Sequence, residues 1–397
     1  MEAVHNSGDH TIRASWNQVA AFRLSRHHLS KRAPADALGP VAGDMTGAQA
    51  QVLLAAQMSL WTRVKVPRIQ DVDAALWKKR ELVRAWCMRR TMFLLPSNEL
   101  AIFARGTARR PEYNLRWALA RVDSRQKLDK LLDDVADILK KPRSRNDIAH
   151  LLKSQGYKLK LKAGGGWGDS RSVPYVGVGG ASLSVGFLLH AIGARDVICS
   201  GPNVGNESTF VRADKWLPHW KDISQDRAEE ELVVKYLKAY GPATVADFAL
   251  WIGLYVRDAK EIWSRVTEKI AQVDIEGWEA SILQSDLQEL EKAKIDAHVV
   301  RLLPFFDSFV LGHKSHRNII DESNKKKVYR AQGWVSPVLL VDGRAQGVWY
   351  HAEHKGELEI HVTRFSALPS NVSSQLREEA SNLGLFLGCP DVKTVIV

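Results

Sequence analysis

Two glutamines stand on either side of a single small residue in the segment Gln49-Ala50-Gln51. In an extended segment, residues i and i+2 face the same side, so both amides would point together while Ala50 faces the core. In a helix the two side chains would diverge by roughly 200°, and Gly47 with the preceding turn residues favours a non-helical entry. Each amide offers a carbonyl acceptor and two N–H donors but no titratable proton. The pair can therefore orient a water molecule or stabilise charge, although such triplets are also common as plain polar surface.

The other residue types that carry chemistry predict no metal or thiol site. Cys87, Cys199 and Cys389 are far apart, and the chain has no CxxC or Cys/His ligand spacing. We therefore expect no metal and no cofactor. The N-terminal segment has no apolar stretch after a charged region, and no run approaches the roughly 20 apolar residues of a membrane helix. These features predict a cytoplasmic protein without membrane contact.

The positive charge of the chain is concentrated in patches. The 397 residues include 56 Lys and Arg against 45 Asp and Glu, for a net charge of +11. Residues 76–145 alone hold 18 Lys and Arg against 8 Asp and Glu, and residues 299–330 hold 7 against 3. Such patches are typical of surfaces that bind nucleic acid, and solvated helix faces are the alternative.

The elements expected in the first half are helices followed by short strands. After a flexible tail over the first nine residues, helical patterns begin at Ser15, a suitable N-cap, and at Val52. A further helix is expected over 71–86, a strand over 89–96 and a helix over 128–139. Ser144 or Asn146 would cap the next helix, residues 164–174 would form a loop, and a helix over 183–193 would precede a hairpin around residues 201–207. Helices followed by a small hairpin are the outline of a winged helix.

The outline repeats in the second half. Residues 228–266 predict helix, tight turn, helix and helix, with wing strands within 269–284. The part from His298 to Thr363 is rich in strand patterns around an Asp342-Gly343 turn, and a helix over 370–383 follows. The fold class is therefore α+β, with tandem winged-helix units and a C-terminal hairpin part. The expected domains are 1–110, with the Gln-x-Gln segment, then 111–222, 223–295 and the β-rich 296–397.

Six segments in this order resemble the winged-helix DNA glycosylases of the AlkZ and YcaQ type. They are GAQAQ (47–51), MRRTMFLLP (88–96), CSGPNVGNESTFV (199–211), AYGPATVADFALWIGL (239–254), LLPFFDSFVLGHKSHR (302–317) and GWVSPVLLVDGR (333–344). The resemblance implies three winged-helix units and a β-barrel-like part that form a concave, C-shaped surface. It also implies that Gln49 and Gln51 are catalytic. The final Gln resembles the AlkZ branch, which is tied to self-resistance against DNA-alkylating or crosslinking natural products.

Two uncharged amides suit an alkylated purine better than an ordinary base. Alkylation at N3 or N7 makes the base cationic, so it leaves without being protonated. The enzyme then has mainly to place a water and to stabilise an oxocarbenium sugar, which glutamine dipoles can do. The hypothesis is a monofunctional glycosylase that removes N-alkylated purines from double-stranded DNA and unhooks interstrand crosslinks, acting as a monomer. The alternative is a non-catalytic winged-helix protein that binds DNA or regulates transcription.

The resemblance also assigns residues around the glutamines. Phe93 stands where relatives often have a histidine; it would be part of the site wall or would fill the core of a strand. Asp307 matches a regular acidic residue of the family and would be structural or line the active site. Arg89 and Arg90 would contact the DNA backbone. The residues on the turn after 311 would reach phosphates or enter the minor groove near the lesion: His313, Lys314, His316 and Arg317. The three lysines Lys325, Lys326 and Lys327 would contact phosphates or form a solvated run.

Overall fold

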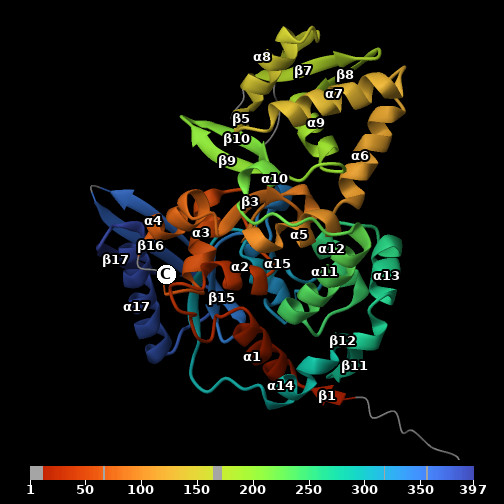
Figure 1. Cartoon of the computed structure of the whole chain (residues 1–397). Coiled ribbons are helices and arrows are strands. Elements are labelled where there is room, and N and C mark those ends of the chain that lie inside the picture. The colour runs from red at the N-terminus through yellow and green to blue at the C-terminus, as the bar shows by residue number, and fades with distance from the viewer. Residues whose placement is uncertain (1–11, 66–67, 164–171, 317, 355) are drawn as a thin grey trace, which may run out of the picture.

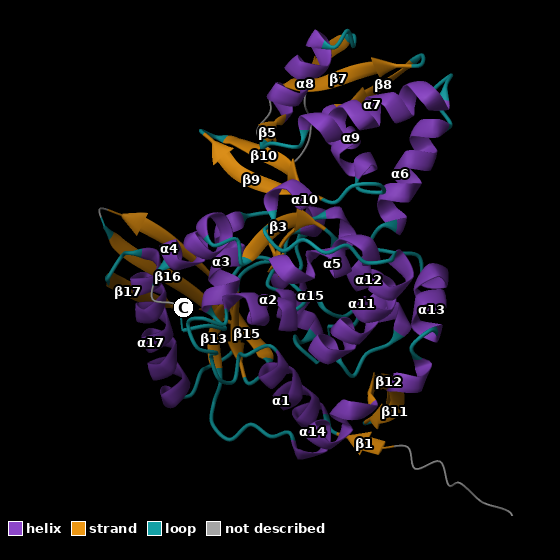
Figure 2. Cartoon of the chain, in the orientation of Figure 1, coloured by secondary structure: helices purple, strands orange, loops and turns teal. Residues whose placement is uncertain are grey.

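The computed structural model describes residues 12–65, 68–163, 172–316, 318–354 and 356–397. Helices and strands are mixed throughout the chain (Figures 1 and 2). The elements between α7 and β10 form the upper lobe in Figure 1, and the N-terminal and C-terminal elements share the larger part below it. None of the helices in the described ranges combines the length and the apolar composition that a membrane crossing needs.

One connectivity occurs in three stretches, which we call unit 1 (38–96), unit 2 (125–212) and unit 3 (225–283). A helix leads into a very short strand, then come two more helices, and a hairpin follows. Unit 1 contains α2 (Leu38–Asp44), β2 (Ala48–Gln49), α3 (Leu53–Trp61), α4 (Ile69–Asp73), β3 (Leu82–Trp86) and β4 (Met92–Pro96). Unit 2 contains α7 (Arg125–Ile138), β5 (Arg143–Ser144), α8 (Arg145–Ser154), α9 (Val185–Ile192), β9 (Ile198–Val204) and β10 (Glu207–Arg212). Unit 3 contains α11 (Gln225–Tyr240), α12 (Val245–Ile252), α13 (Val256–Ser264), β11 (Ile270–Ile275) and β12 (Trp278–Leu283).

In each unit the short strand pairs with the second strand of the hairpin. β2 pairs with β4, and β5 pairs with β10. In unit 3 a single residue, Ala243, takes the place of the short strand and exchanges two backbone hydrogen bonds with Ser281 in β12. The sheets of units 1 and 2 join at the Ala85–Cys199 bridge, which gives the strand order β2-β4-β3-β9-β10-β5. The two halves of this sheet therefore mirror each other.

Side-chain caps start the second helix of units 2 and 3. Ser144 accepts a hydrogen bond from the backbone N–H of Asp147, and Thr244 accepts one from that of Asp247. In return, each Asp carboxylate accepts a hydrogen bond from the backbone N–H of its cap residue. Such reciprocal caps satisfy backbone donors that a helix cannot pair internally. The expected caps Ser15 and Ser144 are confirmed. At its other end α12 stops at Gly253, whose φ of 81° favours glycine.

Further elements extend or connect the units. Unit 2 carries an inserted three-stranded sheet before α9, made of β6 (Leu159–Ala163), β7 (Ser172–Val178) and β8 (Ala181–Ser184). The connectors are α5 (Leu100–Gly106), α6 (Arg109–Leu119), α10 (Ala213–Trp216) and α14 (Leu287–Lys292). At the N-terminus, β1 (Ile12–Ala14) pairs in parallel with β11 of unit 3, and α1 (Trp16–Arg26) packs on α11 and α14. The first described elements of the expected 1–110 domain therefore contact unit 3.

The C-terminal part is an open sheet in the order β13-β14-β15-β16-β17. Its strands are β13 (Val300–Leu303), β14 (Val338–Val341), β15 (Arg344–His354), β16 (Glu357–Arg364) and β17 (Asp391–Ile396). The expected Asp342-Gly343 turn is confirmed, with φ values of 50° and 82° that suit a two-residue hairpin. Helix α17 (Ser370–Leu387) connects β16 to the parallel β17 and packs on the sheet. The barrel-like expectation was wrong: β13 and β17 are not paired in the described residues, and they form opposite edges.

Two other expectations need correction. The helix expected over 71–86 ends in a π-helical stretch, Ala74–Lys78, and β3 then begins at Leu82. Arg80 adopts a φ of 57°, which turns the chain so that residues 82–86 can pair with β4, a contact that local periodicity does not register. Within the strand-rich part expected from His298 to Thr363, the segment 301–312 is a strand only at its start. Asp307 caps the short helix α15 (Ser308–Leu311) there. Most of the expected 164–174 loop and the whole tail lie outside the described residues, while Ser172 already begins β7.

Candidate functional site

The Gln49-Ala50-Gln51 segment lies between β2 and α3. Gln49 pairs with Phe93 of β4, and the backbone N–H of Ala50 donates to the carbonyl of Met92 over 2.6 Å. Ala50 is fully buried and Gln51 is exposed. The extended conformation expected for the segment is therefore confirmed for Gln49, and Ala50 faces the core as expected. The chain bends at Gln51 before it enters α3.

The amide of Gln49 is held by an arginine from the turn between β3 and β4. Only 8% of Gln49 is exposed, and its Oε1 accepts a 2.9 Å hydrogen bond from Nη2 of Arg89. Nη1 of Arg89 donates over 2.7 Å to the carbonyl of Trp251 at the end of α12. The guanidinium also lies over the ring of Phe93, 5.5 Å from its centroid. Arg89 thus connects the Gln-x-Gln segment of unit 1 to unit 3.

A second arginine, Arg84 in β3, was missed by the sequence reasoning. Its Nε and Nη2 donate to the carbonyl of Ala50 over 3.2 and 2.9 Å. Desolvation lowers the pKa of Arg84, and it lowers the pKa of Arg89 to about 10, so both side chains remain cationic near neutral pH. One signal was available: Arg84 interrupts an otherwise apolar strand, and a charged residue there requires a specific partner.

The loop before the glutamines is fixed from the C-terminal part. The hydroxyl of Ser308 donates to the carbonyl of Gly47 over 2.6 Å. Beside it, Asp307 accepts two hydrogen bonds from Arg63, at 2.7 and 2.8 Å, and neither side chain is exposed. Asp307 also accepts from the hydroxyl of Ser59 and from the backbone N–H of Phe309. These contacts join α3 to α15, which supports the structural role considered for Asp307. The carboxylate of Asp307 has no surface exposed to solvent.

Phe93 occupies the strand next to the glutamines. It is 2% exposed, and it packs with Val83, Leu95 and Tyr240 in one hydrophobic cluster. Its position under the Arg89 guanidinium also makes it part of the wall beside Gln49. Phe93 therefore fills the core of the strand and also borders Gln49. Hydrophobic packing is sufficient to explain a phenylalanine at this position.

The basic residues after α15 separate into buried and exposed positions. His313 is 4% exposed, and its ring Nε2 lies 2.8 Å from the carbonyl of Tyr240. Burial holds the pKa of His313 well below its usual value, so the ring is neutral and donates inward. The phosphate contact expected for His313 does not fit this interior position. Lys314 is exposed, and Arg317 lies outside the described residues.

The remaining members of this basic group lie near α16 (Lys325–Val328). His316 stacks on Tyr329 with ring centroids 3.9 Å apart, and burial lowers its pKa to about 4, so it carries no charge near neutral pH. Lys325 pairs with Glu322 at 3.3 Å. Lys326 and Lys327 are exposed, and Lys327 donates to Asn324. Lys314 and Lys326 are therefore the members of this group that best fit phosphate contacts.

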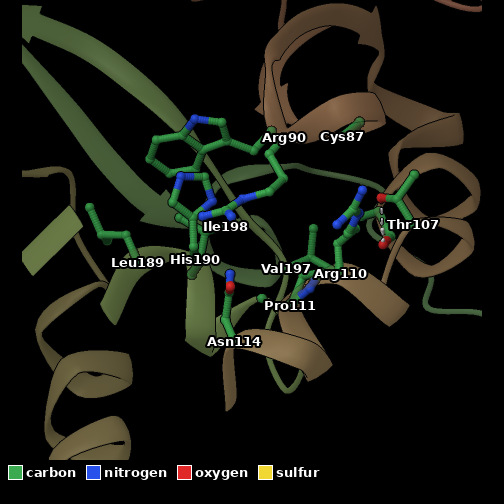
Figure 3. A pocket seen from close by; sticks show the side chains of 13 residues that line it. Cys87, Arg90, Thr107, Arg110, Pro111, Asn114, Leu189, His190, Val197 and Ile198 are labelled. Atoms are coloured by element: carbon green, nitrogen blue, oxygen red, sulfur yellow. Dashed lines mark hydrogen bonds between the residues drawn. The ribbon is translucent and has the colours of Figure 1, made fainter. Parts of the chain in front are cut away.

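A small pocket lies beside Arg90, where β3, α6 and α9 meet. Its volume is about 40 Å³, and Arg90, Asn114 and His190 are among the polar residues that surround it (Figure 3). Burial, followed by the charges of Arg90 and Arg145, lowers the pKa of His190 to about 4. A volume of this size accommodates water molecules. Arg90 itself is exposed.

Alternative chemistries find little support near the glutamines. The three cysteines are free and buried, and burial raises the pKa of Cys87 and Cys199, which disfavours a reactive thiolate. Across the described ranges no group of three His, Cys, Asp or Glu side chains could hold a metal ion. The arrangement instead offers the amide of Gln49 in the edge strand β2, in contact with the Arg89 guanidinium, and the exposed amide of Gln51 just beyond the end of that strand.

The fold with its three repeated helix-and-hairpin units matches one family of DNA glycosylases. The family model described as DNA glycosylase AlkZ-like matches residues 42–386, and the chain belongs to this family. It is therefore a hydrolase that acts on N-glycosidic bonds in DNA. A curated relative from Streptomyces sahachiroi, an interstrand DNA cross-link repair glycosylase, is 29% identical over 400 residues, which is 97% of this chain and 100% of the relative. The solved structure of Streptomyces sahachiroi DNA glycosylase AlkZ matches with a TM-score of 0.78 and 27% identity, over 97% of this chain and 100% of that one.

Proposed function

We propose that this protein hydrolyses the N-glycosidic bond of N7- and N3-alkylated purines in double-stranded DNA and also releases bases held in interstrand crosslinks. The observation that carries the proposal is the position of the two amides: Arg89 holds Gln49 at the end of β2, and Gln51 follows two residues later with an exposed side chain. The name of the Streptomyces sahachiroi relative, an interstrand DNA cross-link repair glycosylase, supports the crosslink substrate. A role in self-resistance to a DNA-alkylating product fits the Gln-x-Gln form of the motif.

The chemistry requires little from the protein because the alkylated base is already a leaving group. Gln49 and Gln51 hold a water molecule beneath the anomeric carbon, and an amide carbonyl that faces the sugar stabilises the developing oxocarbenium ion. Among the residues that the structure describes, the cations hydrogen-bonded to the segment are Arg84, at the carbonyl of Ala50, and Arg89, at Gln49. Guanidinium groups keep their protons at neutral pH and do not act as nucleophiles. Water is therefore the nucleophile, and an abasic site is the product of a monofunctional enzyme.

Units 1, 2 and 3 are proposed to be winged helices within domains 1–110, 111–222 and 223–295, followed by the C-terminal domain 296–397. Their order of helix, short strand, two helices and hairpin supports this division. The three units would form a concave surface for the duplex, bound by one copy of the chain. Exposed cations at Arg90, Lys314 and Lys326 would contact phosphates, which position a duplex without reading its sequence.

The test is single-turnover release of 7-methylguanine from methylated duplex DNA, with enzyme in excess. We expect Gln49→Ala and Gln51→Ala each to slow release by about 100-fold or more, the usual effect of removing one preorganised polar group. Gln126→Ala, at an exposed position on α7, is the matched control and should release base at the wild-type rate. Undiminished rates in both variants would refute the assignment. DNA binding by the wild type without any base release would favour the non-catalytic alternative.

A further inference from the structure

The partner of Gln49 determines which end of its amide faces the site. A guanidinium carries only N–H donors, so the amide atom that faces Nη2 of Arg89 at 2.9 Å must be the carbonyl oxygen. The opposite amide orientation would place N–H groups against N–H groups and would lose the hydrogen bond. The orientation of this glutamine is therefore fixed by chemistry, although amide oxygen and nitrogen are otherwise hard to tell apart.

Arg89 is itself held in place by unit 3. Its Nη1 donates to the carbonyl of Trp251, and its backbone has a φ of 54° in the turn between β3 and β4. A Cβ added to Gly253 would lie 2.8 Å from Cα of Arg89, so the end of α12 packs tightly against this turn. The guanidinium consequently has little freedom to follow Gln49 if the amide rotates. It acts as a fixed donor behind the Gln-x-Gln segment.

The same pattern applies to the peptide between the two glutamines. The carbonyl of Ala50 accepts from Nε and Nη2 of Arg84. Guanidinium donors thus engage the side-chain carbonyl of Gln49 and the main-chain carbonyl of Ala50. Gln51 differs from both, because its side chain is exposed to solvent.

We infer that Arg89 is a positioning residue that turns the Gln49 carbonyl inward, so that Gln49 presents N–H donors to the attacking water and Gln51 supplies the carbonyl acceptor. This division of roles rests on the proposed function. A water that accepts from Gln49 and donates to Gln51 keeps a second lone pair for the anomeric carbon. Its oxygen bonds to C1′, the glycosidic C–N bond breaks with its electron pair on the purine, and the released proton passes to solvent. The alkylated purine leaves neutral, and the released proton carries away the positive charge of the cationic substrate.

The first experiment measures single-turnover 7-methylguanine release for Arg89→Ala in three backgrounds, after subtraction of the enzyme-free rate. In the wild type and in Gln51→Ala we expect Arg89→Ala to slow release about tenfold or more, as for loss of one charge-assisted hydrogen bond. In Gln49→Ala it should slow release less than about twofold, because its target is absent. Arg227→Ala, which removes an exposed arginine paired with Glu231 on α11, is the matched control and should change no rate.

Binding and folding are measured alongside these rates. A role in DNA binding alone would raise the Kd of Arg89→Ala and leave the saturated rate unchanged, which would overturn the inference. An equal slowing in all three backgrounds, or no slowing in the wild type and Gln51→Ala, would also overturn it. If the wild type itself releases no base, the proposed function fails. If Gln49→Ala and Gln51→Ala are slow but Arg89→Ala shows no coupling to Gln49, only the inference fails.

If Arg89→Ala folds poorly, charge-changing variants of the glutamines test the same division of donor and acceptor roles between Gln49 and Gln51. Gln51→Glu keeps an acceptor, so it should retain more activity than Gln51→Ala and lose it at acid pH as the new carboxylate, with an ordinary pKa of about 4.3, is protonated. Gln49→Glu keeps only acceptors and would pair with Arg89, so it should be as slow as Gln49→Ala. A Gln49→Glu variant that is as fast as wild type would overturn the inference.

Discussion

The Asp307→Ala substitution removes the carboxylate that accepts two hydrogen bonds from a fully buried guanidinium. Arg63 and Asp307 have no exposed side-chain surface, and their two hydrogen bonds are 2.7 and 2.8 Å long. Removing one partner of such a pair typically costs about 3–5 kcal/mol, because the remaining charge is left without compensation. The substitution also removes the cap on the backbone N–H of Phe309, which is worth about 1 kcal/mol. We therefore expect a loss of about 4–6 kcal/mol, a large part of the roughly 5–15 kcal/mol that stabilises a typical domain.

Urea unfolding followed by the fluorescence of the 13 tryptophans measures this loss. The matched control is Asp321→Ala, which breaks a pair with Arg344 in which both side chains are largely exposed and should cost about 1 kcal/mol or less. Replacing both partners, as in Arg63→Met with Asp307→Leu, should recover much of the stability. The interpretation of Asp307 as structural would be refuted if Asp307→Ala were as stable as the control. A folded Asp307→Ala protein with a 100-fold slower single-turnover rate would instead make Asp307 part of the catalytic site.

Three further predictions concern the segment before the glutamines, the buried histidine and the basic surface. Gly47→Ala should destabilise the protein by about 2–4 kcal/mol in urea unfolding, because φ is 90° and the new Cβ would lie 2.7 Å from Leu95; Gly277→Ala, at φ 87° in open space, should cost only the backbone strain of about 1–2 kcal/mol. Burial holds the pKa of His27 well below its usual value, so the unfolded chain binds the proton first and stability should fall as pH drops below about 6.5. His27→Leu should reduce the slope of the unfolding free energy against pH by the equivalent of one proton. An unchanged slope would contradict the attribution of this pH dependence to His27. Lys326→Ala should lower the slope of log K against log salt by about 1 if Lys326 contacts a phosphate, as DNA titrations at several salt concentrations can measure.

Local signals in the sequence were sufficient where neighbouring residues decide the outcome. The caps Ser15 and Ser144 and the Asp342-Gly343 turn lie where the sequence predicted them, because each depends on contacts a few residues apart. Local periodicity failed over 71–86, where pairing between β3 and β4 overrides the helical pattern after Lys78. The β-rich C-terminal part was also predicted, but whether its sheet closes depends on which strands form its edges.

At the two glutamines, the sequence determined the local conformation of the segment, and the tertiary structure determined its partners. The spacing of Gln49 and Gln51 around a small residue determined that the segment enters extended with Ala50 in the core, since side chains alternate along a strand. Only the folded chain brings Arg89, 40 residues away, to Gln49 and joins it to the carbonyl of Trp251 in unit 3. The same holds for Arg63 and Asp307, which are 244 residues apart. Desolvated charges require partners, and which partner lies within hydrogen-bond distance is determined by how the units pack together.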